Sequence, residues 1–129
     1  MLFRSGRSFS LGIADSVTVL ATDASTADAA ATLIANAVDV ASPLIERRPA
    51  DALDPDSDLG RRLVTRRVPT LPAAAVEAAL DGGCRAAGAI LTDGRIAAAA
   101  LSLQGRYRTL GNAAAEAYLK LATPPENQR

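Results

Sequence analysis

The chain has 129 residues, which is enough for one domain but too few for two domains of ordinary size. Its 14 basic and 14 acidic residues cancel, so net charge gives no attraction to nucleic acid or to an anionic membrane. It has no histidine and a single cysteine, which excludes Ser-His-Asp and Cys-His catalysis and an internal disulfide. No stretch is long enough to span a bilayer, and we expect a reduced, cytoplasmic protein.

The first expected elements are strands followed by a helix. Residues 9–14 and 16–21 predict one long or bulged strand, or two strands that meet at Asp15. A Thr-Asp pair ends this pattern, and Ser25 then supplies the N-cap of a helix over residues 25–38.

The middle of the chain is expected to hold a loop and a short strand. Pro43 and Pro49 predict a loop around residues 45–53, because proline interrupts both helices and sheets. Residues 54–60 read Asp-Pro-Asp-Ser-Asp-Leu-Gly, which is strongly turn-forming. A short strand is predicted near residues 63–68.

A short second helix is expected next. Pro72 suits a helix start, residues 73–80 are rich in alanine, and the pair Gly82-Gly83 predicts the end of the helix. Cys84 follows in an apolar stretch, where a small buried residue is the usual role of an unpaired cysteine.

The apolar runs 86–91 and 96–103 predict a hairpin. Asp93-Gly94 lies between them, and Asp-Gly between apolar runs is a strong signal for a primed turn. The glycine of such a turn needs a positive φ, so a β-branched residue at Gly94 should destabilise it. A peripheral last helix is expected over residues 112–121.

The order of these elements favours an α+β fold, in which helices cover one face of a mainly antiparallel sheet. We expect residues 1–122 to form one domain portion and residues 123–129 to be a disordered tail. An apolar hairpin with uncovered edges leaves room for a homo-oligomer.

Asp28 and Thr32 form the candidate site. A spacing of four places both side chains on one face of the expected helix, where two oxygens could share one hard cation or one phosphate. Two structural explanations stay open. With Ser25 as N-cap, Asp28 would complement the helix dipole, and Thr32 would donate a hydrogen bond to the carbonyl four residues earlier.

The strand and helix around this pair resemble a known family. Residues 17–21, Val-Thr-Val-Leu-Ala, followed by residues 27–33, Ala-Asp-Ala-Ala-Ala-Thr-Leu, look like the C-terminal motif of the ApbE flavin transferases. These enzymes move FMN from FAD onto a protein threonine. The resemblance implies that Asp28 and Thr32 are magnesium ligands at the diphosphate of a flavin.

Four further segments resemble an uncharacterised branch of the ApbE superfamily, namely residues 7–15, 31–39, 54–60 and 101–105. The glycine-rich segments that cradle the flavin in that superfamily have no counterpart here. The chain therefore looks like the C-terminal half alone, which implies a missing upstream half or a partner chain.

Two functions follow as hypotheses. In the first, the chain binds a flavin or another diphosphate-containing nucleotide with Mg²⁺, as an incomplete relative of the FAD-dependent FMN transferases. In the second, it is a non-catalytic binding or assembly module, or a truncated fragment without activity. The second hypothesis rests on ligand number, because one aspartate and one threonine are few ligands even for Mg²⁺.

Overall fold

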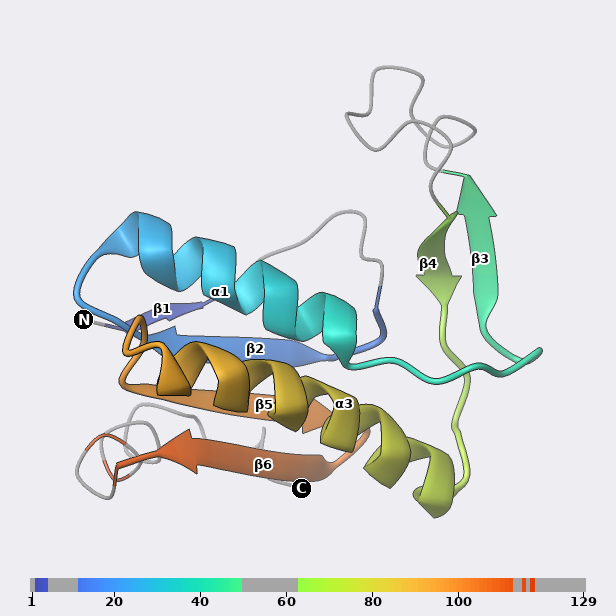
Figure 1. Cartoon of the computed structure of the whole chain (residues 1–129). Coiled ribbons are helices and arrows are strands. Elements are labelled where there is room, and N and C mark those ends of the chain that lie inside the picture. The colour runs from blue at the N-terminus through green and yellow to red at the C-terminus, as the bar shows by residue number, and fades with distance from the viewer. Residues whose placement is uncertain (1, 5–11, 50–62, 113–114, 116, 118–129) are drawn as a thin grey trace.

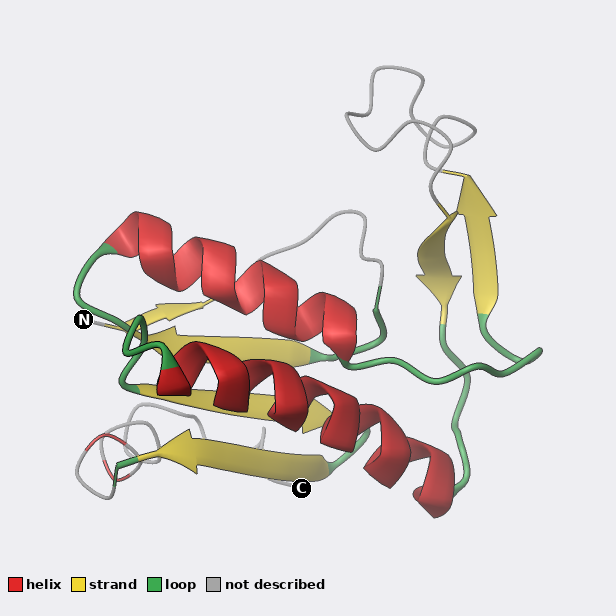
Figure 2. Ribbon diagram, in the orientation of Figure 1, coloured by secondary structure: helices red, strands yellow, loops and turns green. Residues whose placement is uncertain are grey.

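The computed structural model describes residues 2–4, 12–49, 63–112, 115 and 117. Over these residues the fold is α+β, as predicted: two helices lie on one face of a four-stranded antiparallel sheet, and a two-stranded ribbon stands beside them (Figures 1 and 2). The strands of the sheet follow the order β1-β2-β5-β6, and β3 pairs with β4 in the ribbon. The elements are β1 (Leu2–Arg4), β2 (Ser16–Leu20), α1 (Ala24–Ala37), β3 (Glu46–Pro49), β4 (Leu63–Arg67), α3 (Ala73–Thr92), β5 (Ala98–Leu103) and β6 (Arg106–Gly111).

The main core lies between the sheet and the two helices. Alternate residues of β2 and β5, such as Val19 and Leu101, point toward the helices and are fully buried. They meet the buried face of α1, which consists of Ile34 and four alanines. Because alanine is small, the helices lie close to the sheet, and the core needs few large side chains.

Glycines allow α1, α3 and the approach to β2 to pack closely. A Cβ atom at Gly12 would collide with the backbone carbonyls of Ala35 and Val38 at the end of α1. A Cβ atom at Gly83 of α3 would collide with the side chains of Val38 and Leu101. These close approaches fix where the two helices cross over the central strands.

The ribbon of β3 and β4 forms an arm, defined here as residues 46–49 and 63–67. Its register pairs Glu46 with Arg67 and Arg48 with Val64, with a bulge after Glu46. Figure 1 shows the arm standing away from the helices and the sheet, beyond the C-terminal end of α1. At the root of the arm, Arg47 Nη2 lies 2.5 Å from Asp39 Oδ1, which ties β3 to the segment that follows α1.

The predicted hairpin is wrong in its position. Residues 86–91 continue α3, which does not stop at Gly82-Gly83 but runs to Thr92. Asp93-Gly94 ends this helix: the Gly94 N–H donates to the carbonyl of Leu91, and Gly94 has a φ of +75°. The positive φ expected at Gly94 is therefore present, although it belongs to a helix end and not to a hairpin.

The observed hairpin joins β5 and β6. Its turn consists of Gln104 and Gly105, whose φ values of +47° and +81° are those of a two-residue primed turn. Glutamine rarely adopts a positive φ, and here its side chain is held by Leu71 N–H and by the Pro69 carbonyl. These two hydrogen bonds anchor the turn to the segment that precedes α3.

Other predictions of elements had mixed outcomes. The first helix and the strand at residues 63–67 are confirmed, whereas the loop expected at residues 46–49 is strand β3. The N-cap of α1 is Asp23 and not Ser25. Residues 12–14 are not a strand, so β2 begins at Ser16.

Several predicted segments lie wholly or partly outside the described residues. They are residues 9–11, the turn at 54–60, most of the helix over 112–121, of which only residues 115 and 117 are described as helical, and the tail over 123–129. In the part of the chain that the structure describes, neither helix has the length and apolar character that crossing a membrane requires.

Candidate binding groove

A cavity of about 490 Å³ lies between the first turns of α1 and the end of α3. We call this cavity the α1–α3 groove. Its volume falls within the range of small-molecule binding sites. It is lined by Ser25, Thr26, Ala29, Ala30, Leu33, Ile90, Asp93 and Arg95.

The floor of the groove is apolar. Ala29 and Leu33 lie one turn apart on α1, and Ile90 faces them from α3. Leu33 is 60% exposed, so its side chain presents apolar surface to solvent at this site. A ligand seated here would remove this apolar surface from water.

The N-cap of α1 shapes one wall. Asp23 Oδ1 accepts hydrogen bonds from the Thr26 N–H at 2.8 Å and from the Ser25 hydroxyl at 2.9 Å. Asp23 Oδ2 accepts from the Thr26 hydroxyl at 2.9 Å. These bonds, first of all the one from the Thr26 N–H, hold the pKa of Asp23 below its ordinary value of 3.8. A carboxylate therefore stays charged beside the groove at neutral pH.

Replacing Asp23 with alanine should lower the thermal midpoint, because Thr26 N–H and two hydroxyls lose their acceptor. The folded-state pKa is depressed, so this stabilisation is present above the unfolded pKa and declines as the pH falls through and below 3.8. We therefore expect the difference in midpoint between wild type and Asp23→Ala to be constant from pH 5 to 7, within roughly a degree, and to shrink near pH 3. Circular-dichroism melts across this range measure it.

Asp28→Ala, which removes an exposed carboxylate on the same helix, is the control and should show a small difference at every pH. A difference for Asp23→Ala that is undiminished at pH 3 would contradict the capping role.

The end of α3 forms the opposite wall. Asp93 and Arg95 stand at its rim, with Arg95 Nε 3.9 Å from Asp93 Oδ2, and both side chains are more than half exposed. The Arg95 N–H donates to the carbonyl of Ile90 at 3.3 Å, which fixes this turn against the helix end. Asp93 and Arg95 are the charged residues of the lining, and the Asp23 carboxylate, which accepts hydrogen bonds from Ser25 and Thr26, lies beside it.

The predicted site residues Asp28 and Thr32 are not part of this groove. Both are exposed on α1, and the Thr32 hydroxyl donates to the backbone carbonyl of Asp28 at 3.1 Å. That bond is the one expected if Thr32 has a structural role. Asp28 is not in the first turn of a helix capped by Asp23, so the capping role expected for it is wrong.

A metal role for Asp28 and Thr32 stays a prediction. Among the described residues, no group of three or more aspartate, glutamate, cysteine or histidine residues is placed to hold a metal ion. Two oxygens on one exposed helix face would fill only two coordination positions of a Mg²⁺ ion, and water would occupy the others.

A second cavity, of about 470 Å³, lies at the start of α3. It is lined by Val68, Thr70, Leu71, Ala73, Val76, Gln104 and Arg106.

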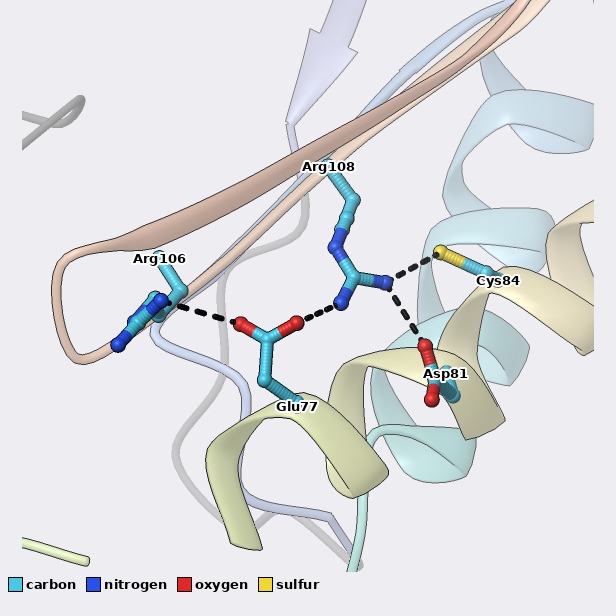
Figure 3. A network of polar contacts seen from close by, with 5 residues as sticks. All are labelled: Glu77, Asp81, Cys84, Arg106 and Arg108. Atoms are coloured by element: carbon cyan, nitrogen blue, oxygen red, sulfur yellow. Dashed lines mark hydrogen bonds and ion pairs between the residues drawn. The ribbon is translucent and has the colours of Figure 1, made fainter. Parts of the chain in front are cut away.

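Beside this cavity, Glu77 of α3 contacts both Arg106 and Arg108 of β6. Arg108 also lies 2.9 Å from Asp81 Oδ1 and 3.9 Å from Cys84 Sγ (Figure 3). The hydrogen bonds to Asp81 and Glu77 raise the pKa of Arg108, so the guanidinium stays charged. Because its charges are paired with one another, this cluster braces α3 against β6.

Part of the α1–α3 groove could have been found in the sequence. Ser25, Ala29 and Leu33 recur at intervals of four, which places a small and partly apolar stripe on one side of the helix. The α3 side of the groove could not, because the sequence pattern around Ile90 predicts a strand. The groove exists only where two segments about 60 residues apart in the chain meet, an arrangement that tertiary packing creates.

Comparison with known families places the chain outside the ApbE flavin transferases. A family model described as AbpE bacteria matches residues 3–109, which is most of the chain. This is a different family, so the resemblance to ApbE was wrong, and the flavin and magnesium roles that it implied lose that basis. No curated protein and no solved structure matches the chain.

Proposed function

The chain belongs to the AbpE bacteria family, and we propose that it is a non-catalytic binding module whose α1–α3 groove takes a basic, partly apolar protein segment. The observation that supports this is the groove itself: an apolar lining with an exposed leucine, with Asp93 and Arg95 at the rim. A few buried residues commonly supply most of the binding energy of an interface, while charged groups around them select the partner.

The groups that line the groove suit recognition better than catalysis. The hydroxyls of Ser25 and Thr26 both donate to Asp23, and Asp93 pairs with Arg95. Nucleophilic catalysis would need a hydroxyl or thiol beside a general base that is free to accept its proton. Cys84 does not line the groove, and its sulfur faces Arg108.

The charges at the rim favour a cationic partner. Asp93 and Arg95 line the groove, and the Asp23 carboxylate lies beside it, bound by the lining residues Ser25 and Thr26, so carboxylates outnumber guanidinium groups here. An arginine of the partner could pair with Asp93, while an apolar neighbour covers Leu33 and Ile90. Exposed ion pairs are individually weak, so the apolar floor should supply most of the affinity.

The test uses a short fluorescein-labelled peptide in which leucine and arginine alternate. Fluorescence anisotropy should show saturable binding to the full chain, and Leu33→Asn should weaken it roughly ten-fold, because one apolar anchor is lost. Leu44→Asn is the matched control, since Leu44 is 59% exposed, close to the 60% of Leu33, and lies outside the groove.

Two results would contradict the proposal. One is equal binding by the Leu33→Asn and Leu44→Asn variants. The other is equal affinity for a peptide in which glutamate replaces arginine, because the rim should disfavour an acidic ligand.

A further inference from the structure

We propose that the second cavity, at the start of α3, binds a small organic carboxylate whose charge pairs with Arg106 and whose apolar body covers the cavity floor. We call this cavity the α3 entry pocket. It shares no described lining residue with the α1–α3 groove, so the inference goes beyond the proposed function and does not depend on it.

Hydrogen bonds tie the walls of the α3 entry pocket to one another. Gln104 Oε1 accepts from the Leu71 N–H at 2.9 Å, and Gln104 Nε2 donates to the Pro69 carbonyl at 2.8 Å. The Gln104 N–H donates in turn to Asp15 Oδ2 at 2.7 Å. Gln104 has a φ of +47°, a costly conformation for glutamine that these bonds maintain. The pocket therefore has a fixed shape before a ligand arrives, which lowers the conformational cost of binding.

The floor of the α3 entry pocket is apolar. Leu71 and Val76 line it and are buried, and the half-buried Val68 lies beside them. Ala73 is three residues before Val76, so both lie on the same side of α3. The volume of about 470 Å³ is within the range of small-molecule sites. A compact hydrocarbon body seated here would be removed from water.

Arg106 gives the α3 entry pocket a preference for an anion. It is the one charged side chain among the described residues that line the pocket. Its Nη1 lies 3.5 Å from Glu77 Oε1, while the other oxygen of Glu77 is engaged by Arg108. Figure 3 shows another nitrogen of the Arg106 guanidinium turned away from Glu77. Because a guanidinium has five N–H donors, Arg106 can bind a carboxylate and keep its contact with Glu77.

The charge at the α3 entry pocket suits a carboxylate better than a phosphate. A single arginine matches the single negative charge of a carboxylate, whereas a doubly charged phosphate needs further donors. The first turn of α3, which has no side-chain cap, adds the positive end of the helix dipole beside Arg106. The apolar floor and this charge together select a small monoanion with a hydrocarbon body.

The test uses 4-methylpentanoate as the probe and 4-methylpentanamide as a neutral analogue of the same shape. Adding 4-methylpentanoate to the full chain should shift the backbone amide NMR signals of Leu71, Ala73, Gln104 and Arg106 in a saturable way. The dissociation constant should be on the order of 1 mM, since so small a ligand has few atoms to contribute affinity. The neutral analogue should bind roughly ten-fold more weakly, because it has no charge to pair with Arg106.

Three variants locate the binding. Arg106→Gln should weaken binding of 4-methylpentanoate roughly ten-fold. Arg95→Gln is the matched control, because Arg95 is also exposed and close to a carboxylate but lines the α1–α3 groove; it should bind the probe like wild type. Ala73→Leu adds bulk at an exposed lining position and should abolish binding while Arg106 stays intact. Circular dichroism verifies that each variant is folded.

Three results would overturn the carboxylate site. They are equal affinity for the acid and the amide, unchanged affinity in both Arg106→Gln and Ala73→Leu, and no saturable shift up to about 20 mM probe. Shifts confined to Ser25 and Ile90 would place the anion in the α1–α3 groove, which also overturns this site. Binding of the leucine-arginine peptide is measured separately through Leu33→Asn, so the failure of either proposal is distinguishable from the failure of the other.

Discussion

Replacing Gly12 with alanine should destabilise the fold by about 3 kcal/mol, at the upper end of the cost of overpacking a core. The added methyl group would collide with the backbone carbonyls of Ala35 and Val38. These carbonyls cannot move easily, because the Val38 carbonyl also accepts a hydrogen bond from the Ile13 N–H at 2.8 Å. The end of α1 must therefore shift away from the sheet. Urea unfolding followed by circular dichroism measures the loss.

Gly88→Ala is the matched control, because Gly88 lies inside α3 with no atom within 4 Å of the position of a Cβ atom. Alanine is favoured over glycine in a helix interior by about 0.5–1 kcal/mol, so this variant should be more stable than wild type. The same chemical change is thus expected to have opposite signs at the two positions. Equal effects at Gly12 and Gly88 would show that the close approach to α1 does not constrain Gly12.

The contrast between these glycines explains why the sequence misassigned α3. The pair Gly82-Gly83 predicts a helix end, because paired glycines weaken a helix. In the structure they allow the end of α1 to lie against α3, since a Cβ atom at Gly83 would collide with Val38. Packing between α1 and α3 offsets the cost of two glycines inside the helix. A local sequence pattern does not contain this contribution.

The helix end predicted at Gly82-Gly83 also put the predicted hairpin in the wrong place. Residues 86–91 are apolar and short, a pattern that fits a buried strand or part of a buried helix equally well. Asp93-Gly94 suits a primed turn and also a helix end, because both need a glycine with positive φ. The real turn uses Gln104, which propensity disfavours, because hydrogen bonds from Leu71 and to Pro69 hold its side chain. Those partners are more than 30 residues away, beyond any local pattern.

Elements with strong local signals were predicted well. The helix α1 follows a polar start and has regular apolar spacing. The strand β4 contains the β-branched residues Val64 and Thr65 and is followed by Pro69. The candidate site was less predictable. Its α1 wall could be read as a stripe of small residues, but its α3 wall and the charges of Asp93 and Arg95 depend on how two distant segments pack.

Replacing Leu101 with alanine should cost about 3 kcal/mol, which is the middle of the range for a fully buried leucine. Leu101 lies on the central strand β5 and faces the helices, so its loss leaves a cavity beneath α3. Leu110→Ala on the edge strand β6 is the comparison and should cost clearly less, because Leu110 is only partly buried. A loss at Leu101 no larger than that at Leu110 would contradict this assignment of the core.

Combining Leu101→Ala with Gly83→Ala tests whether the two helices and the sheet meet at this point. Gly83→Ala alone should cost about 2 kcal/mol, because its methyl group would collide with Leu101 and with Val38. In the double variant the collision with Leu101 disappears and the new methyl group fills part of the cavity, so the total loss should be about 1 kcal/mol smaller than the sum of the single losses. Leu101→Ala combined with Gly88→Ala should be additive within about 0.5 kcal/mol, since nothing lies near a Cβ atom at Gly88. Additivity in both pairs would mean that Gly83 and Leu101 do not touch, and that the helix crossing is set elsewhere.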